Sequence, residues 1–165
     1  MTADVVTLLL LAGVCDVAPC DPLEITEKAW LVQEACGDLP AARPHGDECR
    51  RILIALWHKE TGGTLTLWLS GVWTGSGQGP LQMVQPWDCY SNTRIRRVCI
   101  PTHELWVPET ALKHAVWLLR LKWARSRSPG RAIEAYNGTP DAPSYRRAVE
   151  KVLRRMDDVS ERDVL

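Results

Sequence analysis

Apolar residues at helical spacing, separated by clear start and stop signals, limit most strongly what this chain can fold into. The segment after Pro143 places its apolar side chains at nearly ideal 3.6-residue spacing: Tyr145, Ala148, Val149, Val152, Leu153 and Met156. A long helix is likewise predicted from Pro108, with a stripe of Leu112, Ala115, Val116, Leu119 and Trp123. Amphipathic helices need a shared core, so the sequence predicts a mostly α-helical protein.

Capping signals predict the other helices. Asp21-Pro22, with Glu24 three residues after the cap, begins a helix that ends at Gly37. Asp47 begins another, which carries an apolar face and stops at Thr61-Gly62-Gly63. Short helices are predicted over 2–14 and 80–88, a loop over 39–46, a basic loop over 89–99, and a helix from Ser128-Pro129 to Asn137-Gly138.

One short region predicts β structure. Leu65, Leu67 and Leu69 alternate with polar residues, which is typical of a strand, and Gly71–Gly79 indicates a loop or hairpin tip. The 165 residues suffice for one domain. We therefore predict a single α+β domain, mostly α, with a small β element in its first half.

Charge is unevenly distributed although the net charge is zero. Residues 1–93 carry a net −6, residues 94–155 a net +9 and residues 156–165 a net −3. A basic C-terminal half is attracted to anionic polymers, but it is also what an ordinary solvated helical surface looks like. No helix-turn-helix or RNA-binding signature accompanies it, so no nucleic-acid partner is predicted.

Six cysteines are many for a cytosolic chain. None forms the C-x2-C pair of a zinc ribbon. Disulfides in an oxidising compartment are predicted, and sequential pairing is our hypothesis because each pair brackets a loop-like segment: Cys15–Cys20, Cys36–Cys49 and Cys89–Cys99. Buried free thiols are the alternative, and the spacing alone does not fix the pairing.

The N-terminal segment Val5–Val14 is apolar but too short to span a bilayer. It has the length of a signal-peptide core, yet the preceding Met-Thr-Ala-Asp lacks a basic residue, so a signal peptide is doubtful. We expect a helix packed on the domain and no membrane span.

Glu60 is the leading candidate for a catalytic residue. It follows Leu56 by four residues and Ile52 by eight, so it extends the apolar face of its helix. It also lies at the helix C-terminus, where the dipole disfavours negative charge. Both effects favour the protonated carboxyl that general-acid catalysis requires. The alternative is a helix-end glutamate turned to water.

Three segments in order carry a resemblance to a known family: Lys59-Glu60-Thr61-Gly62-Gly63, Gly79-Pro80-Leu81-Gln82-Met83 and Ala135-Tyr136-Asn137-Gly138. Together with the tyrosine-led closing helix over 145–152, they resemble the soluble lytic transglycosylases and the related goose-type lysozymes, over about residues 47–156. Several positions depart from the family pattern: Thr61 replaces the commonest Ser, Pro80-Leu81 replaces Leu-Met, and Gly138-Thr139-Pro140 replaces Ala-Gly-Pro.

The resemblance implies a lysozyme-like catalytic domain over 47–156, preceded by N-terminal helices over 1–46 and followed by a charged tail over 157–165. It implies that Glu60 is the acid and base, that Gln82 lines the sugar cleft, that Tyr136 lies near Glu60, and that Asn137 binds sugar or holds its loop. No metal or cofactor is expected, because the histidines at 58, 103 and 114 show no ligand spacing.

The implied reaction is cleavage of the MurNAc–GlcNAc bond in peptidoglycan glycan strands, in the periplasm, cell envelope or extracellular space. The resemblance favours lytic transglycosylation to 1,6-anhydro ends, and simple hydrolysis is the alternative. Asp88 and Asp141 are possible second carboxylates, but nothing in their context favours them. A non-catalytic wall-binding or virion structural protein and a disulfide-rich helical adaptor are the rival classes. Assembly into a virion or an envelope machine is a further expectation.

Overall fold

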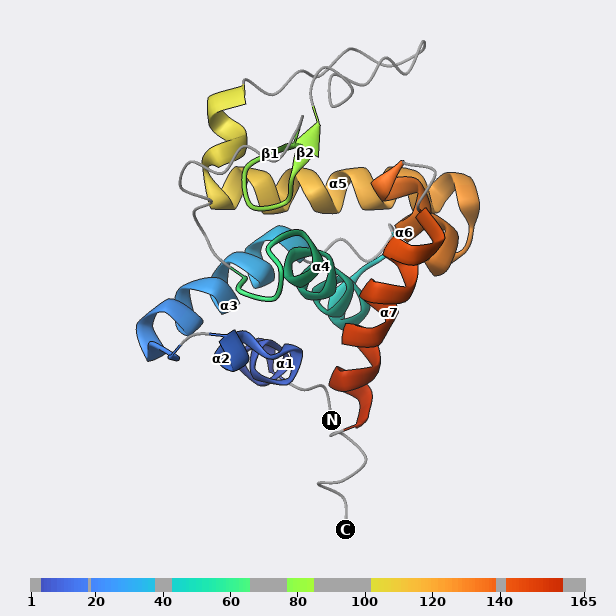
Figure 1. Ribbon diagram of the computed structural model, residues 1–165. Helices are drawn as coiled ribbons and strands as arrows, with labels where there is room; N and C mark the ends of the chain where they lie inside the picture. Colours follow the sequence, from blue (N-terminus) through green and yellow to red (C-terminus); the bar gives the residue numbers. More distant parts are fainter. Residues whose placement is uncertain are drawn as a thin grey trace.

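The computed structural model describes residues 4–17, 19–37, 43–65, 77–84, 102–138 and 142–158, and these residues are mainly helical (Figure 1). The α-helices are α1 (Val5–Ala12), α2 (Val14–Val17), α3 (Pro22–Cys36), α4 (Gly46–Glu60), α5 (Pro108–Ser126), α6 (Pro129–Asn137) and α7 (Ala142–Asp158). A 3-10 helix, η1 (Thr102–Trp106), precedes α5, and two-residue strands β1 (Gly77–Gln78) and β2 (Met83–Val84) form a hairpin. The predicted mostly α-helical class is confirmed.

Helix α4 lies at the centre of the molecule. Every residue from Ile52 to Trp57 is buried, which is the behaviour expected of a helix enclosed on all sides. Helices α1, α3, α5 and α7 all contact it, and Figure 1 shows α5 crossing the molecule on one side of α4 while α7 runs beside it. The last residue of this central helix is Glu60.

The predicted helix starts agree well with the structure, but one break between two helices was not predicted. Asp21 accepts a hydrogen bond from the backbone N–H of Leu23 at 2.9 Å and caps α3 as predicted. Helix α4 begins at Gly46, one residue before the predicted start. The predicted helix over 2–14 is instead two helices, because Gly13 adopts φ 95° and ends α1 before α2 begins.

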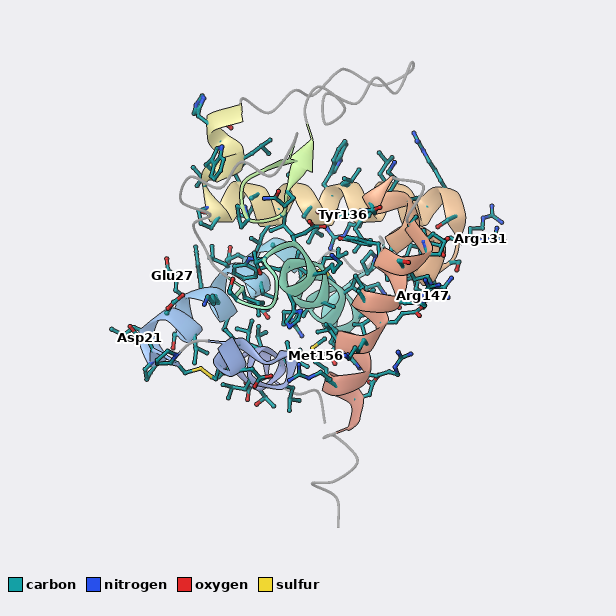
Figure 2. All side chains as sticks on the ribbon, in the orientation of Figure 1. Asp21, Glu27, Arg131, Tyr136, Arg147 and Met156 are labelled. Atoms are coloured by element: carbon teal, nitrogen blue, oxygen red, sulfur yellow. A yellow bond between two sulfur atoms is a disulfide. The ribbon has the colours of Figure 1, made fainter. Side chains whose placement is uncertain are left out.

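The periodicity of the closing helix is borne out. Tyr145, Val149, Val152 and Met156 of α7 are buried. Figure 2 shows Met156 directed from α7 toward α1, the two helices being in contact. The N-terminal helices therefore share one core with α4 and α7.

The predicted helix over 80–88 is wrong in its described part. Residues 79–82 form the turn of the β1–β2 hairpin, and residues 83–84 pair with 77–78. Gly79 has φ 67°, and a Cβ there would collide with the backbone carbonyl of Leu105. Gln82 also has positive φ, at 48°. Neither value is helical, and Pro80 serves the turn rather than a helix start.

The strand predicted from 64 to 70 is not seen. Thr64 and Leu65 belong to no strand, and Leu65 has a left-handed φ of 45°. Residues 66–70 lie outside the described residues, as do the predicted basic loop over 89–99 and most of the Gly71–Gly79 loop. Apart from the two-residue hairpin ladder, the described residues contain no β structure.

Two of the three predicted disulfides are present. Cys15 bonds to Cys20 with a Cα–Cα distance of 5.1 Å, and Cys36 bonds to Cys49 with a Cα–Cα distance of 5.8 Å. The predicted 89–99 pair lies outside the described residues. Cys36 and Cys49 are both buried and tie the end of α3 to the first turn of α4. None of the helices in the described segments combines the length and the apolar character that a bilayer crossing demands.

Candidate active site

The carboxyl of Glu60 meets the phenol of Tyr145. Glu60 ends α4, Tyr145 lies in the first turn of α7, and the Tyr145 hydroxyl donates a hydrogen bond to Glu60 Oε1 at 2.5 Å. Tyr145 is only 6% exposed, and Glu60 is half-buried. The Lys59 ammonium lies 5.5 Å from the centroid of the Tyr145 ring. Two segments 85 residues apart in sequence therefore meet at one carboxyl group.

Burial raises the pKa of Glu60 above its ordinary value of 4.5, although the Tyr145 hydrogen bond and the Lys59 charge each partly oppose the rise. Burial also raises the pKa of Tyr145, and the neighbouring Glu60 charge adds to that rise. Tyr145 therefore stays protonated and remains a hydrogen-bond donor. A carboxyl with a raised pKa and a fixed neutral donor is suited to giving and then retaking a proton.

Thr61 fixes the chain immediately after Glu60. Its buried hydroxyl donates to the carbonyl of Trp57 at 2.8 Å and accepts from the N–H of Leu65 at 2.9 Å. The backbone N–H of Gly63 bonds to the His58 carbonyl at 2.8 Å. One hydroxyl thus satisfies a helix-end carbonyl and a turn N–H together, which explains why a hydroxyl residue follows the glutamate.

Thr61→Val is expected to lower the free energy of unfolding by about 2 kcal/mol, because an isosteric methyl removes both bonds and leaves the Leu65 N–H without its acceptor. Thr61→Ser keeps the hydroxyl and should cost under about 1 kcal/mol. Urea unfolding of the three proteins measures the difference. Equal losses for Val and Ser would show that the hydroxyl does not hold this turn.

The Ala135-Tyr136-Asn137 segment ends α6 beside the same site. Tyr136 is half-buried against the core, and its proximity contributes to the raised pKa of Tyr145. Figure 2 shows Tyr136 beside α5, the helix against which α6 packs. Asn137 is the last residue of α6 and is half-buried. The prediction placed Tyr136 near Glu60, and the structure puts it near the phenol that bonds Glu60.

Tyr145 begins the closing helix that contributes to the family resemblance, but no role at the site was predicted for it from the sequence. Its position on the buried stripe of α7 identified it as a core residue, and nothing in a one-dimensional pattern distinguishes a core tyrosine from one that donates to a carboxylate. The available signal was a polar hydroxyl on an otherwise apolar stripe, because a buried phenol needs a hydrogen-bond partner.

Gln82 lies in the hairpin turn. Its side-chain Nε2 donates to the Gly79 carbonyl at 2.9 Å, and its backbone N–H donates to the same carbonyl at 3.0 Å. Gln82 therefore stabilises the hairpin turn through both its side chain and its backbone N–H. A place for Gln82 in a sugar cleft remains a prediction.

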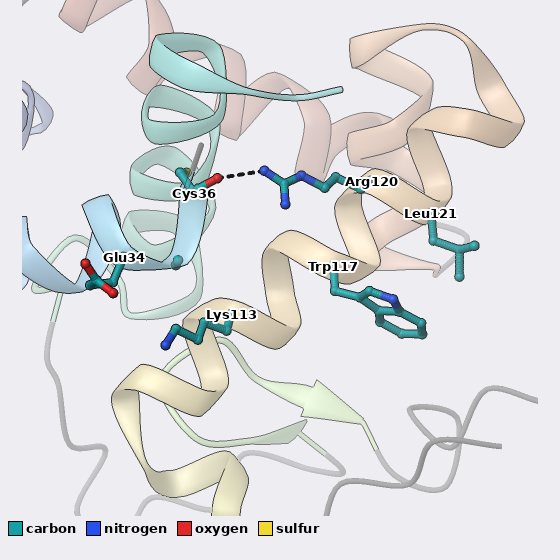
Figure 3. A pocket seen from close by; sticks show the side chains of 8 residues that line it. Glu34, Cys36, Lys113, Trp117, Arg120 and Leu121 are labelled. Atoms are coloured by element: carbon teal, nitrogen blue, oxygen red, sulfur yellow. Dashed lines mark hydrogen bonds between the residues drawn. The ribbon is translucent and has the colours of Figure 1, made fainter. Parts of the chain in front are cut away.

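A groove of about 540 Å³ lies between the end of α3 and the middle of α5 (Figure 3). Its walls include Glu34 and Cys36 from α3 and Lys113, Trp117 and Arg120 from α5. Arg120 donates to the Cys36 carbonyl at 2.7 Å and so links α5 to the end of α3. Glu60 and Tyr145 do not line this groove, so it is separate from the carboxyl–phenol pair.

His114 packs against Trp117, one of the residues that line that groove. It is buried, stacks on Trp117 with ring centroids 5.3 Å apart, and burial lowers its pKa to about 4. His58 lies two residues before Glu60 and therefore on a different face of α4. It is half-buried, and burial lowers its pKa as well. Within the described segments, no three His, Cys, Asp or Glu residues gather as a metal ion would require.

Comparison with protein-family models, with curated proteins and with solved structures gives no match to this chain. The fold and the site therefore define it only as a disulfide-bonded, mostly helical protein with a half-buried, phenol-bonded carboxyl at the end of its central helix. Any function must be argued from that geometry.

Proposed function

We propose that this protein is a lysozyme-like enzyme that cleaves the β-1,4 bond between MurNAc and GlcNAc in peptidoglycan, with Glu60 as general acid and then base. The observation that carries the proposal is the Glu60–Tyr145 pair: a carboxyl with a raised pKa at a helix end, held by a donor from a distant helix. The order of the Glu60, Gln82 and Tyr136 segments supports the same assignment.

The reaction follows from what a protonated carboxyl can do. Glu60 gives its proton to the glycosidic oxygen while the bond from that oxygen to C1 of MurNAc breaks, and an oxocarbenium-like state forms at C1. The carboxylate then takes a proton from the oxygen that attacks C1. Tyr145 stabilises this carboxylate through its hydrogen bond, so the acid is regenerated without a second carboxyl group.

The nucleophile is the remaining choice, and we propose that it is the sugar's own 6-hydroxyl. Among the described residues, the groups that act on the pKa of Glu60 are the Tyr145 phenol and the Lys59 ammonium. Asp88 and Asp141, the two candidate second carboxylates, lie outside the described residues. A two-carboxylate glycosidase needs a second acid across the bond. A tethered hydroxyl brings an effective molarity of roughly 10⁵ M or more. The product is then a 1,6-anhydro end.

Digestion of glycan strands in water enriched in heavy oxygen tests the nucleophile. The internal route gives products without label and about 18 mass units lighter than hydrolytic products, since the sugar's own hydroxyl forms the new bond. Mass spectrometry of the released fragments measures both. Label at the new MurNAc end would make the enzyme a hydrolytic lysozyme and would leave Glu60 as its acid.

Tyr145→Phe is expected to move the alkaline limb of the kcat/KM profile to higher pH. The Tyr145 hydrogen bond lowers the pKa of Glu60, so its loss lets that pKa rise, and the protonated acid persists to higher pH. Tyr136→Phe is the comparison variant and should move the limb less. An unchanged or lower limb in Tyr145→Phe would exclude Tyr145 as the group that sets the Glu60 pKa.

A non-catalytic wall-binding protein is the second candidate, and the α3–α5 groove favours it because that groove does not involve Glu60. The two candidates differ in one assay. A suspension of purified cell walls loses turbidity if the protein cuts the glycan strands. If the protein only binds the walls, the turbidity does not fall. The disulfides and the proposed substrate both suit a cell-envelope or extracellular location.

A further inference from the structure

A row of positive side chains runs along the outer side of α7 and onto α6; we call it the cationic ridge, formed by Arg131, Arg147, Lys151 and Arg154. Arg147, Lys151 and Arg154 follow one another at intervals of four and three residues, which places them on one side of α7. All four side chains are exposed. The buried stripe of α7 faces the core, so this row faces solvent.

Arg131 joins the row because α6 and α7 are fastened together beside it. The guanidinium of Arg146 lies over Gly130, where a Cβ would collide with it, and bonds Glu134 of α6 at 3.3 Å. Arg131 directly follows Gly130 in α6, and Arg147 directly follows Arg146 in α7. Figure 2 shows both at the same edge of the molecule.

The carboxylates of α7 with described side chains are engaged by other cations. Glu150 accepts from Arg146 at 2.6 Å, and Asp157 pairs with Arg51 of α4. Arg147 donates to the uncharged Ser144 hydroxyl at 2.8 Å. In the part of the chain that the structure describes, Lys151 and Arg154 form no ion pair. The ridge therefore carries positive charge that the protein does not neutralise locally.

Like charges three and four residues apart on a helix repel one another, and an anionic partner would remove that repulsion. A row of charges suits a linear polymer, whereas a single small anion would need groups that converge on one point. Three of the four groups are guanidinium ions, whose forked donors match phosphate oxygens. We propose that the cationic ridge binds a linear phosphodiester polymer of the cell envelope and so holds the enzyme on the wall.

The choice of an envelope polymer as the source rests on the proposed function, but the surface itself includes neither Glu60 nor Tyr145. The probe is purified poly(glycerol phosphate), titrated calorimetrically into the full chain at about 50 mM salt, where counterion release favours binding. Binding should be unchanged in Glu60→Gln. A failure of catalysis is therefore distinguishable from a failure of the ridge.

The decisive variant replaces Arg147, Lys151 and Arg154 by Gln. It should bind at least about tenfold more weakly, and the slope of log K against log salt should become shallower by about 2, because three phosphate contacts are lost at roughly 0.7 each. The matched control removes the same charge from exposed positions elsewhere, with Gln at Arg43, Arg125 and Arg127, and should change binding by less than about twofold.

Three results would overturn the proposal. They are no binding by the unaltered protein, equal losses in both triple variants, and binding of single-stranded DNA with the same number of phosphates as tight as or tighter than that of poly(glycerol phosphate). Circular dichroism of both triple variants checks that α7 stays folded. The exposed positions of the substitutions make that the expected result.

Discussion

Glu60→Gln is expected to remove nearly all wall-degrading activity. Glutamine keeps the shape of the side chain, and its carbonyl still accepts from Tyr145, but it has no proton to give to the glycosidic oxygen. General-acid catalysis contributes roughly 10²–10⁴ in rate, so the variant should retain about 1% or less. The measurement is the initial rate of fragment release from purified peptidoglycan.

The same variant has a stability signature that is independent of activity. Burial raises the pKa of Glu60 in the folded protein, so the stability linked to this group is fully present below its unfolded pKa and is lost as pH rises through the folded pKa. Gln escapes that loss. At neutral pH the variant should therefore melt at the same temperature as the parent or higher, with the difference shrinking toward pH 4.

Activity above about a tenth of the parental value would remove Glu60 from the mechanism.

Replacing Cys36 and Cys49 together by Ala is expected to lower the free energy of unfolding by about 3 kcal/mol. The bond closes a sequence separation of 13 residues, and in the chain-entropy model a loop of this length contributes about that amount. Both sulfurs lie in the core between α3 and α4, so truncation also removes packing. Denaturant unfolding without reductant measures the loss.

The Cys15 and Cys20 pair provides the matched comparison. Its separation is 5 residues, Cys15 is exposed and Cys20 half-buried, and the same model gives about 2 kcal/mol. The double Ala variant there should lose less stability than the one at 36 and 49. Thiol titration of the unfolded parent, performed without reductant, should find none of these four cysteines reactive. Equal losses, or free thiols at Cys36 and Cys49, would contradict the connectivity.

The helices were predictable because their signals are local. An Asp cap with Pro at the first turn, as at Asp21-Pro22, determines a helix start without help from the rest of the chain. The same local signal misled at Pro80, which opens a turn. What decides there is tertiary: Gly79 must pass within van der Waals contact of the Leu105 carbonyl, and no spacing of residues near 80 reports a neighbour near 105.

The candidate site also combines features that are local in the sequence with features that depend on tertiary packing. Glu60 could be found from the sequence because its place at the end of an apolar helical stripe is a local property. Its hydrogen-bond partner could not, since Tyr145 meets it only through the packing of α7 on α4. The role of Thr61 was visible only as a motif position. The structure supplies the reason, a hydroxyl that bonds residues four before and four after it.

The most direct test of the central claim is mass spectrometry of the fragments released from purified peptidoglycan by the parent protein and by Glu60→Gln in parallel. The account predicts disaccharide–peptide fragments with 1,6-anhydro-MurNAc ends from the parent and, at the same protein concentration, about a hundredfold fewer from the variant. The absence of glycan cleavage by the folded, disulfide-bonded parent, or equal cleavage by both proteins, would contradict it.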